Sequence, residues 1–103
     1  MPRPCKRRRV CRLPPSCYFK PAGVPVSELE VVVLSLDESE ALRLADSEGL
    51  EQEEAARGMR VSRQTFGNIL RSARRKVTEC LVRGKALRID GGAVNLENQK
   101  FCR

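Results

Sequence analysis

The chain has 103 residues with four aromatic side chains, which limits it to one small domain with a modest core. Twenty lysine and arginine residues exceed thirteen aspartate and glutamate residues, giving a net charge of +7. The longest aliphatic run, Val31 to Leu34, is too short to cross a bilayer, and no apolar stretch follows the basic N-terminus as a signal peptide requires. We therefore expect no membrane contact and a cytoplasmic location.

The chain offers little for catalysis. It has no histidine for acid–base chemistry, no glycine-rich phosphate loop and no nucleophile elbow. The acidic pairs Asp37-Glu38 and Glu53-Glu54 resemble first-turn helix residues that the helix dipole favours. We expect that the protein is not an enzyme.

Charge is divided along the chain into blocks of opposite sign. Residues 1–20 carry a net +7, residues 21–56 a net −9, residues 57–88 a net +9, and residues 89–103 no net charge. Phosphate neutralisation supplies most of the non-specific affinity of proteins for DNA. We expect a polyanion to meet both basic blocks while the acidic block faces elsewhere.

Residues 1–25 are predicted to form an extended basic arm. All six prolines lie in this segment, and proline restrains the backbone to extended or turn conformations. Arg7, Arg8 and Arg9 would lie along DNA phosphates or enter a neighbouring minor groove. A solvated tail is the alternative interpretation.

Residues 26–84 are predicted to form a helical domain. The β-branched Val31, Val32 and Val33 favour a short strand first. Asp37 is a good helix N-cap, with Glu40 three residues later, and the apolar pattern that follows predicts an amphipathic helix ending before Gly49. This helix would brace the elements that come next.

The segment Gln52 to Leu70 predicts two short helices joined by a tight turn. Ala55 and Ala56 provide the small side chains that let two helices approach closely. Ser62 is a favoured N-cap for the second helix, with Thr65 three residues after it. This order indicates a DNA-binding helix-turn-helix, and a simple helical hairpin is the alternative.

Helical spacing divides the second of these helices into two faces. Phe66, Ile69, Leu70, Ala73 and Val77 fall on one side, whereas Gln64, Asn68, Arg71 and Arg75 lie about half a turn away. Arginine can bond both major-groove acceptors of guanine, and glutamine or asparagine can bond adenine. The predicted base-reading residues are Arg63, Gln64, Asn68 and Arg71, and the predicted phosphate contacts on this helix are Thr65, Arg74, Arg75 and Lys76. An ordinary amphipathic helix with a solvated polar face is the alternative.

Residues 85–103 are predicted to form a C-terminal hairpin and tail. Gly84 is well placed to end the long helix in a left-handed conformation. The apolar runs 86–89 and 93–96 flank Asp90-Gly91-Gly92, which favours a β-hairpin that could provide a dimer contact.

The five cysteines do not follow a common metal-binding pattern. Cys5, Cys11 and Cys17 are separated by five residues each, and Cys102 would have to supply a fourth ligand from the far end. Structural zinc sites normally use closely spaced pairs. We expect reduced, unpaired thiols and no cofactor, with zinc bound by these four cysteines as the minor alternative.

Several segments resemble the small prokaryotic family called domain of unknown function 134. They cover nearly the whole chain: the MPRP start, the arginine run, YFKPAG at 18–23, LDE at 36–38, EALRLAD at 40–46, QEEAA at 52–56, VSRQTFG at 61–67 and GKALRI at 84–89. The resemblance implies a helix-turn-helix similar to the fourth region of bacterial sigma factors, and a role in transcription. Arg60 departs from the family by standing where a glycine is expected in the turn.

The sequence therefore predicts a mainly α fold: a helix-turn-helix domain with a basic N-terminal arm and a short C-terminal hairpin. We expect sequence-specific binding of double-stranded DNA by a transcriptional regulator, with a homodimer on two half-sites as a further expectation. Two alternatives stay open. One is a protein-interaction module in which the acidic Glu51, Glu53 and Glu54 contact the transcription machinery, for example RNA polymerase, and the other is RNA binding through the basic arm.

Overall fold

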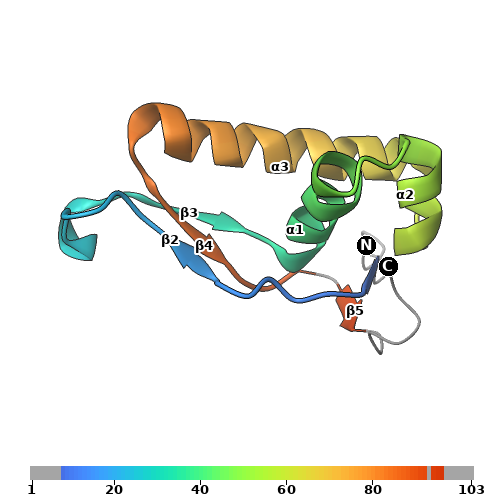
Figure 1. Cartoon of the computed structure of the whole chain (residues 1–103), viewed down its shortest axis with the longest axis horizontal. Coiled ribbons are helices and arrows are strands. Elements are labelled where there is room, and N and C mark those ends of the chain that lie inside the picture. The colour runs from blue at the N-terminus through green and yellow to red at the C-terminus, as the bar shows by residue number, and fades with distance from the viewer. Residues whose placement is uncertain (1–7, 93, 97–103) are drawn as a thin grey trace, which may run out of the picture.

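The computed structural model describes residues 8–92 and 94–96, and in these residues helices pack against small sheets (Figure 1). The strands are β1 Arg8–Val10, β2 Tyr18–Phe19, β3 Val31–Leu34, β4 Ala86–Ile89 and β5 Val94–Leu96. The helices are α1 Leu36–Leu42, α2 Gln52–Met59 and α3 Arg63–Arg83, with a 3-10 turn η1 Val26–Glu28 and a π-helical turn η2 Arg43–Ser47. The fold is thus a compact α/β domain, and the prediction of a mainly α protein is corrected.

One mixed sheet lies against the C-terminal half of α3 (Figure 1). Strand β4 is central, antiparallel to β2 and parallel to β3, so that Leu87 pairs with both Phe19 and Val32. The strand predicted from the three valines is confirmed. Its partner, however, comes from far along the chain.

The predicted C-terminal hairpin is wrong, because β4 and β5 pair with other strands. Strand β5 runs parallel to β1, whereas β4 is held between β2 and β3. The turn between β4 and β5 instead binds the start of α1, where the Leu36 N–H donates to the Gly91 carbonyl at 2.8 Å. Pairing with two distant strands lets β4 bury Leu87 and Ile89 under α3, which an isolated ribbon could not do.

The described part of residues 1–25 is extended, as its prolines predict, and it wraps onto the domain instead of projecting as a free arm. Strand β1 places Val10 and Cys11 in the interior, with 1% and 6% of their surface exposed, and β2 joins the main sheet. Apolar residues between the prolines are therefore part of the core. Residues 1–7, including Arg7, lie outside the described residues.

Helix α1 begins two residues earlier than the sequence predicts. Ser35, not Asp37, is the N-cap, and it forms a capping box in which the Ser35 N–H donates to Glu38 at 2.9 Å. The helical path continues through η2, and Gly49 follows with a φ of 76°.

In the described part of the chain, no helix is both long and apolar enough to span a membrane.

Candidate nucleic-acid interface

Ser62 starts α3, as the sequence predicts. Its hydroxyl oxygen accepts the Thr65 backbone N–H at 3.0 Å and lies 2.9 Å from the Thr65 hydroxyl oxygen. The cap satisfies one of the backbone N–H groups that a helix start leaves without a partner. Thr65 is thereby engaged in the cap, although it was predicted to contact a phosphate.

The turn between α2 and α3 depends on a left-handed residue. Arg60 has φ of 58° and ψ of 43°, and among the described residues it is the one non-glycine with positive φ. The turn closes when the Arg60 N–H donates to the Arg57 carbonyl at 3.1 Å and the Val61 N–H to the Ala56 carbonyl at 3.0 Å. An arginine in this conformation costs about 1 kcal/mol relative to an unstrained residue.

The inner face of α3 is fixed by packing against α1 and α2. Phe66 is completely buried, and it shares a cluster with Ala55, Ala56, Met59 and Leu70. The two alanines let α2 approach α3 closely, as the sequence predicts. Because this packing fixes the rotation of α3 about its own axis, the opposite side of the helix faces solvent.

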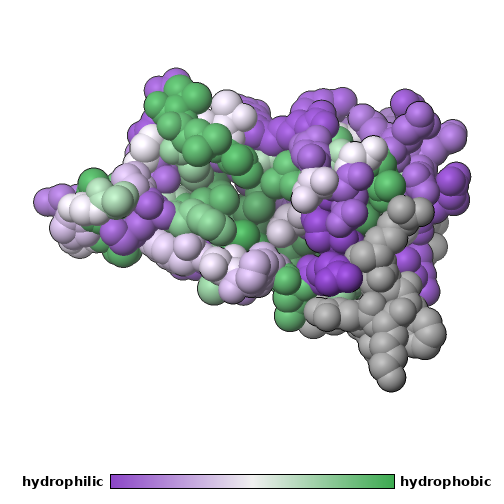
Figure 2. Space-filling view, viewed as in Figure 1, coloured by the Kyte–Doolittle hydropathy of each residue, from purple (hydrophilic) through white to green (hydrophobic). Residues whose placement is uncertain are grey.

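The outer face of α3 carries the residues predicted to read bases. Arg63, Gln64, Asn68, Arg71 and Arg75 are all exposed. Within the residues that the structure describes, the side chains of Arg63, Gln64 and Arg75 have no hydrogen-bond or ion-pair partner, and Arg71 donates to the Asn68 side-chain oxygen at 3.3 Å. Figure 2 shows hydrophilic surface over α2 and the start of α3, with more hydrophobic surface over the C-terminal end of α3 and the sheet.

Arg74 lies on α3 but is held by the acidic segment. Its guanidinium makes two hydrogen bonds with Asp46 of η2, at 2.7 and 3.1 Å. The hydrogen bonds from Arg74 lower the pKa of the Asp46 carboxyl. This predicted phosphate contact is therefore already paired with a carboxylate.

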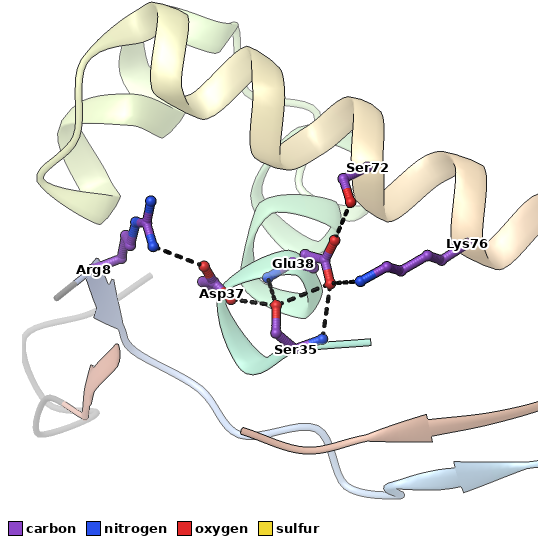
Figure 3. Close-up of polar contacts among 6 residues, drawn as sticks. All are labelled: Arg8, Ser35, Asp37, Glu38, Ser72 and Lys76. Atoms are coloured by element: carbon purple, nitrogen blue, oxygen red, sulfur yellow. Dashed lines mark hydrogen bonds and ion pairs between the residues drawn. The ribbon is translucent and has the colours of Figure 1, made fainter. Parts of the chain in front are cut away.

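Lys76 is paired in the same way, with Glu38 of α1 (Figure 3). The Lys76 ammonium lies 2.7 Å from Glu38 Oε1, and the Ser72 hydroxyl donates to the other carboxylate oxygen. Burial alone would raise the pKa of Glu38, but hydrogen bonds from Lys76, Ser72 and Ser35 lower it overall. Lys76 thus attaches α3 to α1.

The two described arginines of the N-terminal run point into the protein. Arg8 forms an ion pair with the buried Asp37 at 3.4 Å (Figure 3), and the Arg9 Nε–H donates to the Gly58 carbonyl at 2.8 Å. Both were predicted to contact phosphates. In the structure they connect β1 to α1 and α2.

Two further features of the molecule were not singled out from the sequence. Arg57, in the last turn of α2, is exposed, and its side chain has no partner among the described residues. A cavity of about 580 Å³ opens between β2 and the C-terminal end of α3, lined mainly by apolar residues such as Phe19, Val77 and Leu81. Arg57 could have been found from its basic block, but the cavity depends on a strand pairing that no local pattern reveals.

The cysteines are in three different situations. Cys11 is buried and disulfide-bonded, so the expectation of unpaired thiols is wrong for this residue, whereas Cys17 and Cys80 are free. Burial raises the pKa of the Cys80 thiol. Cys5 and Cys102 lie outside the described residues, and among residues 8–92 and 94–96 no three histidine, cysteine or acidic side chains are grouped as a metal site requires.

The sequence is similar to a defined group of bacterial proteins. Residues 1–97 match the family described as "Protein of unknown function DUF134". A UPF0251 protein of Dehalococcoides mccartyi is 55% identical over 99% of this chain and 87% of its own length. A UPF0251 protein of Moorella thermoacetica is 58% identical over all of this chain and 70% of its own length. No solved structure matches the chain.

Proposed function

The chain belongs to the family described as "Protein of unknown function DUF134", and for it we propose sequence-specific binding of double-stranded DNA. In this proposal, α2 and α3 form a helix-turn-helix similar to the fourth region of sigma factors, and α3 lies in the major groove. The protein would act in the cytoplasm as a transcriptional regulator without enzymatic activity.

One observation carries the proposal: the exposed face of α3 combines unpaired polar side chains, two of them predicted base readers, with a rigid support. Arg63, Gln64 and Arg75 have no partner within the described part of the chain, while Phe66 on the opposite side is completely buried. Arginine, glutamine and asparagine are the residues that most often bond base edges in the major groove. The buried side fixes the orientation of α3, and a reading face needs such support because its donors must keep a fixed register.

The distribution of ion pairs supports the same face. Asp46 and Glu38 neutralise Arg74 and Lys76, and Glu79 pairs with Arg83 at 3.0 Å further along α3. Among the described residues, the α3 cations left without a carboxylate are Arg63, Arg71 and Arg75, which lie on the outer side of the helix. The acidic block therefore leaves positive charge concentrated where α3 would meet phosphates.

The length of the face suggests how much DNA one chain can read. Residues 63–71 span about 12 Å along the helix axis, which matches three to four base pairs. So short a site is weakly specific by itself. We therefore propose that a homodimer reads two half-sites about 34 Å apart.

Selection from random duplexes tests this function. The full chain is incubated with random double-stranded DNA in the presence of excess single-stranded RNA, and the retained duplexes are sequenced. A shared short motif, repeated with two-fold symmetry for the dimer, is the expected result. Retention of duplexes without any shared motif, or retention lost to the RNA competitor, would contradict sequence-specific duplex binding.

A second candidate is contact with a basic protein surface, such as one on RNA polymerase. Glu51 and Glu53 are exposed at the start of α2, and within the described residues neither has an ion-pair partner. Replacing both with glutamine should abolish binding to polymerase while leaving duplex affinity equal or higher. Binding to polymerase that survives this change would exclude the acidic residues as its contact.

A further inference from the structure

Asn68 and Arg71 form one unit on the exposed face of α3. They are three residues apart, both are exposed, and Arg71 Nη1 donates to Asn68 Oδ1 at 3.3 Å. We propose that this pair reads guanine, although asparagine taken alone is suited to adenine. The proposal rests on the proposed binding of DNA through α3, and it names the base that the site prefers.

The chemistry of the pair determines which groups remain available. An arginine guanidinium has five N–H donors and no acceptor. It can therefore bond the Asn68 amide only through the oxygen, which fixes the amide with its nitrogen free. The pair then presents donors alone: the amide N–H groups of Asn68 and the remaining guanidinium N–H groups of Arg71.

Guanine and adenine differ in how well their major-groove edges fit a surface that presents only hydrogen-bond donors. Guanine offers two acceptors, N7 and O6, in the major groove, whereas adenine offers the N7 acceptor next to an N6 donor. Adenine would face donors with its own donor and leave both without partners, which is unfavourable in a desolvated interface. Guanine accepts two of these donors and presents no donor of its own against them, so we expect a preference over adenine of about tenfold or more.

Gln64 provides an internal comparison on the same face. It is exposed, and neither its amide oxygen nor its nitrogen has a partner among the described residues. Gln64 can therefore make the two bonds that adenine requires. It lies seven residues before Arg71, about 10 Å along the helix, so the preferred site should contain adenine and guanine about three base pairs apart.

Removing Arg71 should change the preferred base, not merely weaken binding. In Arg71→Ala the Asn68 oxygen is freed, so the amide regains one donor and one acceptor and suits adenine. Arg71→Lys keeps a donor that can hold the oxygen, so guanine should remain preferred. Arg75→Ala is the matched control: Arg75 is an exposed arginine on the same face with no hydrogen bond to Asn68, and losing this predicted phosphate contact should weaken binding without changing the preferred base.

The test is selection from random duplexes with the wild type and these three variants, each checked for folding by circular dichroism. We expect guanine at one position in the wild type, Arg71→Lys and Arg75→Ala, and adenine at that position in Arg71→Ala. Adenine in the wild type, or guanine retained in Arg71→Ala, would overturn the proposal that Asn68 and Arg71 together read guanine. Neither result would contradict the proposed DNA binding. A complete lack of sequence preference in the wild type would overturn the proposed function as well.

Discussion

The Lys76 ammonium lies 2.7 Å from the Glu38 carboxylate, and this contact joins α3 to the first turn of α1. Glu38 also accepts hydrogen bonds from Ser72 of α3 and from Ser35, so one carboxylate completes a helix cap and binds two side chains of the neighbouring helix (Figure 3). Glu38 therefore helps to set the orientation in which α3 presents its outer face. A basic residue of α3 that was predicted to contact a phosphate is thus engaged in an ion pair within the protein.

Glu38→Gln should reduce stability by about 1 to 3 kcal/mol at neutral pH, because hydrogen bonds to a charged group are replaced by weaker ones. The pKa of Glu38 is lowered in the folded protein, so its stabilisation is present above the ordinary glutamate pKa of about 4.3 and is lost as the pH falls through the lower folded value. Urea unfolding between pH 3 and pH 7 measures this. The wild type should lose more stability over that range than Glu38→Gln, and parallel pH profiles for the two proteins would contradict the assignment.

Arg60→Gly should raise the melting temperature by a few degrees. Glycine adopts the left-handed conformation of the turn without the strain of about 1 kcal/mol that arginine carries, although its greater freedom in the unfolded chain offsets part of the gain. Differential scanning calorimetry is the measurement. Arg57→Gly, placed within α2, is the control and should lower the melting temperature; a decrease for Arg60→Gly as well would reject the strained turn.

Ser62→Ala should destabilise the protein by about 1 kcal/mol, because the first turn of α3 loses its cap. Chemical denaturation of the variant measures this loss. Ser62→Asp is the conservative control, since aspartate is an equally good N-cap and should retain most of the stability. If alanine and aspartate have the same effect, the hydroxyl does not act as a cap.

Arg75→Ala and Arg83→Ala should differ in their effect on DNA binding, although both remove an exposed arginine from α3. Arg75 has no partner in the described part of the chain, whereas Arg83 pairs with Glu79. Each phosphate contact contributes up to about one unit to the log–log dependence of affinity on salt. Fluorescence anisotropy at several salt concentrations should show a shallower slope for Arg75→Ala and an unchanged slope for Arg83→Ala. Equal slopes for both variants would contradict the assigned contact.

Local patterns in the sequence predict the helical part of the fold well. The cap at Ser62, the buried face around Phe66 and the end of α3 at Gly84 follow from propensities and spacing within about one helical turn, and the structure confirms all three. The cap at Ser35 was missed because Asp37 is an equally favourable capping residue two positions later.

The sheet and the ion pairs could not be predicted in the same way. Strand β4 pairs with β3 across more than fifty residues, and the local sequence favours a hairpin with β5 instead. Likewise, the sequence predicts phosphate contacts for both Arg74 and Arg75, but it does not reveal that Asp46 pairs with the Arg74 side chain while the Arg75 side chain has no partner among the described residues. Only the packing of η2 beside α3 distinguishes them.

The most direct test of the central claim is an NMR titration of the labelled full chain with a duplex obtained from the selection. We predict that the side-chain amide signals of Gln64 and Asn68 and the Nε–H signals of Arg63 and Arg75 shift together, while the Nε–H signal of Arg83 does not move. Shifts confined to the sheet, or no shift of the Gln64 and Asn68 amides at saturating duplex, would contradict an interface on the outer face of α3.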